Sequence, residues 1–257
     1  MSYQKKAKEE NTRFDRIDAL RGVAIVWMTI FHFCFDLNNF DFLKANFYED
    51  AFWTNQRTCI VSLFLFCAGL GQAVAVSKEL SWARFFKRWK QVVGASLLVS
   101  IGSYLVYPNS FIYFGILHGI ALMLLLLRLL TPLTSFFVFF GAAIIGLKFY
   151  LGAQMESLIQ SWPTLEILNG RWLNWLGLIS RKPITEDYVP VVPWLGVLLI
   201  GYFIGQWLLK NKRNWVTGEL KSNFRWLAVL GQWSLSYYLI HQPVLFGLVF
   251  VAKQITG

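Results

Sequence analysis

Six stretches of this chain carry no aspartate, glutamate, lysine or arginine, and most are long enough to dictate its fold. They lie at 22–35, 58–77, 91–127, 129–147, 188–209 and 226–252. A helix of about 20 apolar residues spans the hydrocarbon core of a bilayer, and its backbone hydrogen bonds are satisfied within the helix itself. The pattern therefore predicts a membrane protein that crosses the bilayer several times.

The run 91–127 is long enough for two spans, and Tyr107-Pro108-Asn109-Ser110 supplies a turn between them. About seven spans are predicted in all, at 17–37, 58–77, 91–107, 111–130, 133–151, 190–209 and 228–251. The composition agrees, because only 15% of the residues are charged, against about 25% in soluble domains. We expect an all-α transmembrane helix bundle that forms a single domain over 1–257, with a flexible cytoplasmic tail at 1–15 and an outer cap segment at 152–189.

Most of the 24 lysine and arginine residues fall on the tail and loops that would share one side of the membrane with the N-terminus. Cytoplasmic loops carry such an excess, so the N-terminus is predicted to be cytoplasmic and the C-terminus outside, in a bacterial cytoplasmic (inner) membrane. Topology and anionic lipid then account for the net charge of +10 better than nucleic acid does. The expected partners are the lipid bilayer and a small-molecule or glycan acceptor, and a homo-oligomer stays open.

The first predicted span, 17–37, carries the ionisable residues that are hardest to explain by packing alone. Arg21 lies near its start, and His32 and Asp36 lie near its end. Arg21 precedes His32 by about three helical turns and His32 precedes Asp36 by about one, so all three share one face. A neutral His32 would suit a general base, and an aspartate one turn away would hold its tautomer and stabilise the imidazolium.

All three histidines, His32, His118 and His241, fall inside predicted spans at similar depth in the outer half of the membrane. An ionisable side chain within a span is costly and normally faces partners or a water-filled cavity. We therefore expect His118 and His241 to join His32 and Asp36 in one pocket. The alternative is structural, with each imidazole capping a backbone carbonyl that a nearby glycine or proline, Gly119 or Pro243, leaves free. No HExxH-like pair is present, so no metal is expected.

Two other segments suggest binding surfaces. In the predicted cytoplasmic segment 81–90, Arg84, Lys87 and Arg88 alternate with aromatic residues. This pattern favours a short amphipathic helix lying at the lipid headgroups, and the functional alternative is a cradle for a polyanionic ligand. The outer segment 152–189 is long and contains three tryptophans, so we expect a partly helical cap on the outer surface.

The stretch Asp18-Ala19-Leu20-Arg21-Gly22, with His32 eleven residues after Arg21, resembles the opening helix of the transmembrane acyltransferase superfamily, including bacterial membrane O-acyltransferases of surface polysaccharides. Further motifs are similar to the heparan-α-glucosaminide N-acetyltransferase-like family of prokaryotic membrane proteins. They are Phe114-Gly115-Ile116-Leu117-His118, Asn174-Trp175-Leu176-Gly177, Val192-Pro193-Trp194-Leu195-Gly196, and residues 230–243. Eukaryotic members place a histidine in the loop after the first span, where residues 48–53 of this chain have none.

The resemblance implies transfer of an acyl group, usually acetyl, from cytoplasmic acetyl-CoA to a saccharide or similar acceptor on the outer side. It implies that His32 is the catalytic histidine and that Arg21 contacts the donor. Asp36, His118 and His241 complete the predicted catalytic group. The predicted binding residues are Arg84, Lys87 and Arg88 for the donor, and Asn38, Trp175, Trp194 and Gln242 for the acceptor.

Two other functions fit the same residues. The first is a proton-coupled transporter or exporter that uses the intramembrane histidines as a relay, although the chain shows no inverted repeat of the kind common in transporters. The second is a structural membrane subunit without chemistry, in which each histidine would be capped individually.

Overall fold

The computed structural model describes residues 14–256, which are helical along most of their length. An isolated bridge between Phe114 and Tyr188 is the extent of β-pairing among them. The α-helices are α2 (Asp15–Asn39), α3 (Ala51–Ser77), α4 (Trp82–Val106), α5 (Ile116–Leu130), α6 (Phe137–Gly152), α7 (Met155–Ser161), α8 (Val191–Asn211), α9 (Arg213–Thr217), α10 (Arg225–Gln232) and α11 (Ser234–Thr256). The predicted tail 1–15 falls almost wholly outside the described residues, and α2 begins at Asp15.

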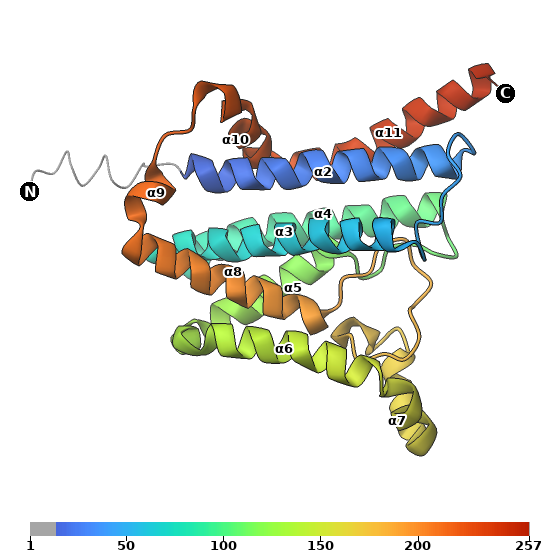
Figure 1. The fold of residues 1–257 in the computed structure, drawn as a ribbon, viewed down its shortest axis with the longest axis horizontal. Coiled ribbons are helices and arrows are strands. Elements are labelled where there is room, and N and C mark those ends of the chain that lie inside the picture. The colour runs from blue at the N-terminus through green and yellow to red at the C-terminus, as the bar shows by residue number, and fades with distance from the viewer. Residues whose placement is uncertain (1–13, 257) are drawn as a thin grey trace, which may run out of the picture. The chain divides into compact units, whose positions relative to one another are not determined.

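Within residues 14–256, six helical stretches are long and apolar enough to cross a membrane. Five of them are α2, α3, α4, α8 and α11. The other is Ile116–Gly152, which holds α5, the 3-10 segment η1 (Thr131–Phe136) and α6. The sequence assigns this stretch to two of its predicted spans, and the chain does reverse direction at η1 (Figure 1). The all-α polytopic fold is therefore confirmed.

The described chain forms two compact units, one from residues 14–64 with 211–256 and one from residues 65–210. In the first unit, α2 packs against both α10 and α11 (Figure 1). The contact with α10 is backbone to backbone. A Cβ on Gly22 would lie 2.1 Å from the carbonyl oxygen of Leu227, and one on Gly231 would lie 1.8 Å from that of Asp18. Only glycine allows two helices this close.

The last predicted span, 228–251, is not one helix. The chain breaks at Trp233, whose backbone N–H donates to the carbonyl of Leu230 at 3.1 Å, so that α10 ends and α11 begins at Ser234. A charge-free run carries no sign of this break, because α10 is set apart by its contact with α2 rather than by a charge. The prediction of a single domain over 1–257 stays a prediction.

The second unit holds the later part of α3 with α4 to α8. The indole N–H of Trp89 on α4 donates to the carbonyl oxygen of Ala121 on α5 at 2.8 Å. Arg128, near the end of α5, donates to the carbonyl of Leu80 at 2.5 Å and lies over the ring of Trp82. These contacts fasten the first turns of α4 to α5.

The basic and aromatic segment 81–90 is not a separate short helix, as one of its interpretations expected. The Ser81 hydroxyl accepts the backbone N–H of Arg84 at 3.4 Å and caps α4, which then runs without a break to Val106. Arg84, Lys87 and Arg88 are exposed on the first turns of this long helix. The segment therefore continues directly into a candidate span.

The predicted cap segment 152–189 is partly helical, with α7 and the 3-10 turns η2 (Pro163–Asn169) and η3 (Asn174–Leu176). Buried Asn174 organises it: its amide donates to the hydroxyl of Tyr113 at 2.7 Å, and its backbone carbonyl accepts from the hydroxyl of Tyr188 at 2.5 Å. Burial raises the pKa of both phenols. The segment is thus an ordered, hydrogen-bonded loop structure.

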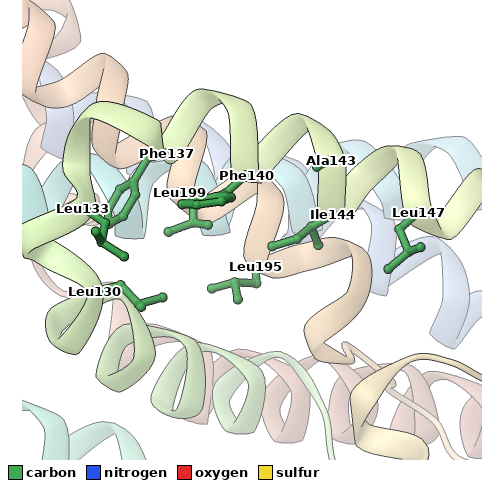
Figure 2. Close-up of a pocket in the computed structure, with 9 residues that line it drawn as sticks. All are labelled: Leu130, Leu133, Phe137, Phe140, Ala143, Ile144, Leu147, Leu195 and Leu199. Atoms are coloured by element: carbon green, nitrogen blue, oxygen red, sulfur yellow. The ribbon is translucent and has the colours of Figure 1, made fainter.

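A cavity of about 450 Å³ lies in the second unit between the end of α5, η1, α6 and α8 (Figure 2). Leucine, isoleucine, phenylalanine and alanine side chains from residues 130–147, together with Leu195 and Leu199, line it. The lining contains no titratable or nucleophilic side chain. The cavity therefore offers no chemistry.

Candidate active site

Two histidines from distant parts of the sequence meet in the first unit. The Nδ1 atom of His32 on α2 lies 2.8 Å from the Nε2 atom of His241 on α11, and the two ring planes are within 15° of each other. His241 is buried, with 6% of its surface exposed, and His32 is partly buried. The predicted meeting of His32 and His241 is therefore present as a direct hydrogen bond.

The second nitrogen of His241 determines which atoms carry the protons. Its Nδ1 lies 2.8 Å from the carbonyl oxygen of Tyr238. A carbonyl only accepts, so His241 Nδ1 carries a hydrogen, and the Nε2 atom of the neutral ring must accept. His32 Nδ1 is then the donor in the bond between the rings. The Nε2 atom of a neutral His32 consequently bears a lone pair and no proton.

A tyrosine and a threonine support this pair. The ring of Tyr237 stacks on that of His241 with centroids 5.7 Å apart. Its hydroxyl is 2.9 Å from Thr29 Oγ, which itself donates to the carbonyl of Ile25 at 2.8 Å and therefore accepts from the tyrosine. Tyr237 is thus tied to α2 while its ring fixes the plane of His241.

An apolar cluster packs against α2 beside His32. Buried Met28, Phe31, Phe47 and Ile60 form its centre, and the ring of Phe31 meets that of His32 edge-on at 5.9 Å. Close packing of this kind holds side chains in single rotamers. The cluster therefore limits the movement of the His32 ring.

The predicted pairing of Asp36 with His32 is wrong in this structure. Asp36 Oδ1 accepts a hydrogen bond from Gln242 Nε2 at 2.8 Å, while His32 Nδ1 is bonded to His241. Asp36 lies one turn beyond His32 on α2. It bonds Gln242, the residue that follows His241 on α11. Three hydrogen bonds thus cross from α2 to α11: Thr29 with Tyr237, His32 with His241, and Asp36 with Gln242.

Arg21 lies on α2 near the contact with α10. Its Nη1 atom is 3.1 Å from Asp18 Oδ1 and 3.4 Å from the carbonyl oxygen of Gly231. The Arg21 side chain is 24% exposed. Arginine has five N–H donors, so these two contacts leave further donors for a ligand.

His118 is placed in the second unit, at the start of α5. Its Nδ1 accepts the backbone N–H of Gly115 at 3.3 Å, and its Nε2 lies 3.1 Å from Ser100 Oγ. The Ser100 hydroxyl donates to the carbonyl of Ile112 at 2.7 Å, so it accepts from His118. Both ring nitrogens therefore have structural partners, although the backbone partner is the N–H of Gly115 and not the carbonyl that the capping alternative expected. The predicted convergence of His118 on His32 stays a prediction.

The other predicted binding residues occupy varied settings. Asn38 Oδ1 accepts the backbone N–H of Ala45 at 2.8 Å, which holds the loop after α2 and occupies that oxygen. The Trp175 indole donates to the carbonyl of Trp172 at 2.8 Å in the cap segment. Trp194 is partly buried near the start of α8. Roles for Asn38, Trp175 and Trp194 in acceptor binding stay predictions.

Sequence reasoning did not identify Tyr237, Tyr238 and Thr29 as parts of the site. Tyr237 and Tyr238 precede His241 by four and three residues, and Thr29 precedes His32 by three, so helical spacing alone places them beside the histidines.

Among residues 14–256, no three or more histidine, cysteine, aspartate or glutamate side chains are grouped as metal ligands would be.

Comparison with known proteins identifies the relationship of this chain. A family model described as heparan-alpha-glucosaminide N-acetyltransferase, catalytic, matches residues 13–243. Comparison with curated proteins and with solved structures gave no match. The matched range contains the whole of the His32–His241 site and confirms the resemblance seen in the sequence. The chain is therefore an integral membrane protein that belongs to the heparan-alpha-glucosaminide N-acetyltransferase catalytic family, a family of membrane N-acetyltransferases.

Proposed function

We propose that this protein transfers an acetyl group from acetyl-CoA to an amine or hydroxyl of a saccharide-type acceptor, with His32 as the general base. The observation that carries the proposal is the hydrogen-bond chain from His32 through His241 to the carbonyl of Tyr238. This chain leaves the unprotonated nitrogen on His32 Nε2, which is what a general base requires.

The chain has the logic of a catalytic triad with a carbonyl at its end. His241 holds His32 in one tautomer, and the Tyr238 carbonyl holds His241. When His32 gains a proton on Nε2, its Nδ1–H still donates to His241, so the imidazolium keeps its partner. The positive charge is then delocalised toward a second ring.

The reaction follows from this assignment. The thioester of acetyl-CoA would supply the activated acyl group. His32 Nε2 takes the proton of the acceptor's amine or hydroxyl as the bond from that nitrogen or oxygen to the acyl carbon forms and the bond from that carbon to sulfur breaks. His32 then returns the proton to the leaving thiolate, which restores the neutral imidazole and completes the proton balance.

Two separate candidates are proposed to bind the phosphates of the donor, Arg21 in the first unit and Arg84, Lys87 and Arg88 in the second. Arg21 is partly buried and keeps unused N–H donors, which suits a planar, multidentate contact with phosphate. Arg84, Lys87 and Arg88 are exposed on the first turns of α4, where backbone N–H groups also favour anions. Neutralising either set should raise the KM for acetyl-CoA more than it lowers kcat.

A proton relay for transport is less well supported by the same contacts. Protons pass along a chain only where each member both gains and loses one. The chain from His32 ends on the Tyr238 carbonyl, which accepts a hydrogen bond from His241 but carries no proton to pass on. The arrangement therefore favours local acid–base chemistry at His32.

Acetyl transfer by the full-length protein in lipid vesicles tests the proposal. Purified protein is incubated with acetyl-CoA and either glucosamine or N-acetylglucosamine, and free CoA thiol and acetylated product are measured. We expect release of CoA that depends on the free amine of glucosamine and is lost in His32→Ala. Absence of transfer and of CoA release in correctly folded wild-type protein, with amine and hydroxyl acceptors alike, would refute the proposal.

The tautomer of His32 supplies a test that needs no substrate. The chain has three histidines, so ¹⁵N labelling of histidine gives few resonances, and single His→Gln variants assign them. We expect neutral His32 to carry its hydrogen on Nδ1, coupled to His241 Nε2. A hydrogen on His32 Nε2 in the neutral ring would remove the base from the position that the mechanism needs.

A further inference from the structure

Asp36 and Gln242 hold two buried oxygens that lack a hydrogen-bond donor. Asp36 is 1% exposed, and its Oδ1 accepts from Gln242 Nε2 at 2.8 Å. Across the described part of the chain, Asp36 Oδ2 and Gln242 Oε1 find no hydrogen-bond partner. A buried acceptor without a donor costs about 1–3 kcal/mol, and more when it is charged. Two such atoms on two bonded side chains call for a common explanation.

Burial restricts what can satisfy these atoms. Each of the two oxygens exposes less than 1 Å², so no solvent-sized atom touches either of them in this conformation. A water or a ligand group needs room of its own, whereas a proton on one of the oxygens needs none. An ionised carboxylate left in this place would also be an unpaired charge inside a membrane span, which is among the costliest arrangements a helix can hold.

The neighbouring titratable groups do not neutralise Asp36. On α2 the histidine one turn away is His32, and its Nδ1 is bonded to His241. On α11 the histidine is His241, which precedes Gln242, and both of its ring nitrogens are engaged, with His32 and with the Tyr238 carbonyl. A hydrogen for Asp36 must therefore come with the carboxyl group itself.

We infer that Asp36 is a neutral carboxylic acid that forms a closed acid–amide pair with Gln242. Gln242 Nε2 donates to Asp36 Oδ1, and the proton on Asp36 Oδ2 donates to Gln242 Oε1, so one hydrogen satisfies both remaining oxygens. Asp36 is then a positioning residue that clamps α2 to α11 one turn beyond the His32–His241 bond. The pair replaces the anionic partner that the sequence suggests for His32.

This state has a consequence for the base, which rests on the proposed function. A neutral Asp36 places no negative charge near His32, so the resting imidazole is not driven toward its protonated form and stays available to accept a proton. The protonation state of Asp36 itself does not depend on the reaction, and it is tested without acetyl-CoA.

Infrared difference spectroscopy of the full-length protein in lipid bilayers at neutral pH makes the test. Subtracting the spectrum of Asp36→Asn from that of wild type should reveal the carbonyl band of a protonated carboxyl group, which shifts in D₂O. The matched control is Asp50→Asn, since Asp50 is exposed and its removal should take away only carboxylate bands. Loss of carboxylate bands from Asp36→Asn, as from the control, would overturn the inference.

Two further variants test the pairing. In Gln242→Met the protonated-carboxyl band must move or vanish, because Oδ2–H has lost its acceptor; an unchanged band overturns the pair. In thermal unfolding, Asp36→Asn should keep the Tm within about 2 °C of wild type, since its amide replaces both hydrogen bonds, whereas Asp36→Leu should lower the Tm by more than about 4 °C. Equal losses in both variants would contradict a neutral, ring-forming side chain.

Discussion

The Nδ1 atom of His32 and the Nε2 atom of His241 are 2.8 Å apart although 209 positions separate the two residues in the chain. The bond links α2 to α11, and the carbonyl of Tyr238 on the far side of His241 sets its direction. A histidine pair held in this way has one defined donor order, and therefore one defined basic nitrogen.

His32→Ala should lower kcat for acetyl transfer by about 10²–10⁴-fold, the usual contribution of a general base. His241→Ala should cost less, because His32 remains, and His241→Gln should recover part of the loss, because a glutamine oxygen can accept from His32 Nδ1. Steady-state kinetics in vesicles measures each value. The double variant should be no slower than His32→Ala alone, since the two residues act as a unit; additive losses would contradict the linkage.

His118→Ala should destabilise the protein by about 0.5–2 kcal/mol, because the backbone N–H of Gly115 loses its acceptor at the start of α5. Ser100→Ala should have a similar effect by removing the bond to the Ile112 carbonyl. Chemical denaturation gives both values, with exposed Ser157→Ala as the control. A double variant whose loss equals the full sum of the single losses would show that His118 and Ser100 do not act together.

Gly231→Ala should destabilise the protein by about 1–3 kcal/mol, because a Cβ at Gly231 would lie 1.8 Å from the Asp18 carbonyl oxygen and force α10 off α2. Gly247→Ala on α11 is the matched control, since nothing lies within 4 Å of a Cβ there. Thermal unfolding in detergent compares the two. Equal Tm values would mean that the α2–α10 contact is looser than described.

The cap segment should lose stability at alkaline pH. Burial raises the pKa of Tyr113 and Tyr188, so the folded state favours the neutral phenols. The stabilisation is then complete below the unfolded pKa of about 10 and falls as the pH rises toward the folded values. Chemical denaturation between about pH 9 and pH 12, a range that includes the free-phenol pKa of about 10, gives the free energy of unfolding. This free energy should fall less with rising pH in Tyr188→Phe than in wild type. Exposed Tyr48→Phe should behave as wild type.

The helices and the family were predictable because their signals are local. Charge-free runs near the length of a bilayer locate most of α3 and α8, and the Asp18–Gly22 motif with His32 identifies the relationship that the family match confirms. The break at Trp233 and the unbroken helix from Trp82 to Val106 were not predictable. Each is decided by packing or capping, which leaves no trace in hydropathy.

The pairing at the site was partly predictable. Helical spacing placed His32, Asp36 and His241 inside spans at similar depth, and the bond between His32 and His241 agrees with that. Spacing also suggested that Asp36 would bond His32, because residues four apart share a helical face. A shared face does not determine which neighbour on another helix lies opposite, and Gln242 takes the carboxyl of Asp36 instead.

By itself, the sequence determined that this chain crosses a membrane as helices and that few ionisable groups lie within the spans. Those are consequences of residue type and of distance along one helix. Only the tertiary structure decided that His32 Nδ1 donates to His241 and that Asp36 pairs with Gln242. Each of these depends on the register between helices that are far apart in sequence, which side-chain packing and backbone contacts such as that of Gly231 with Asp18 set.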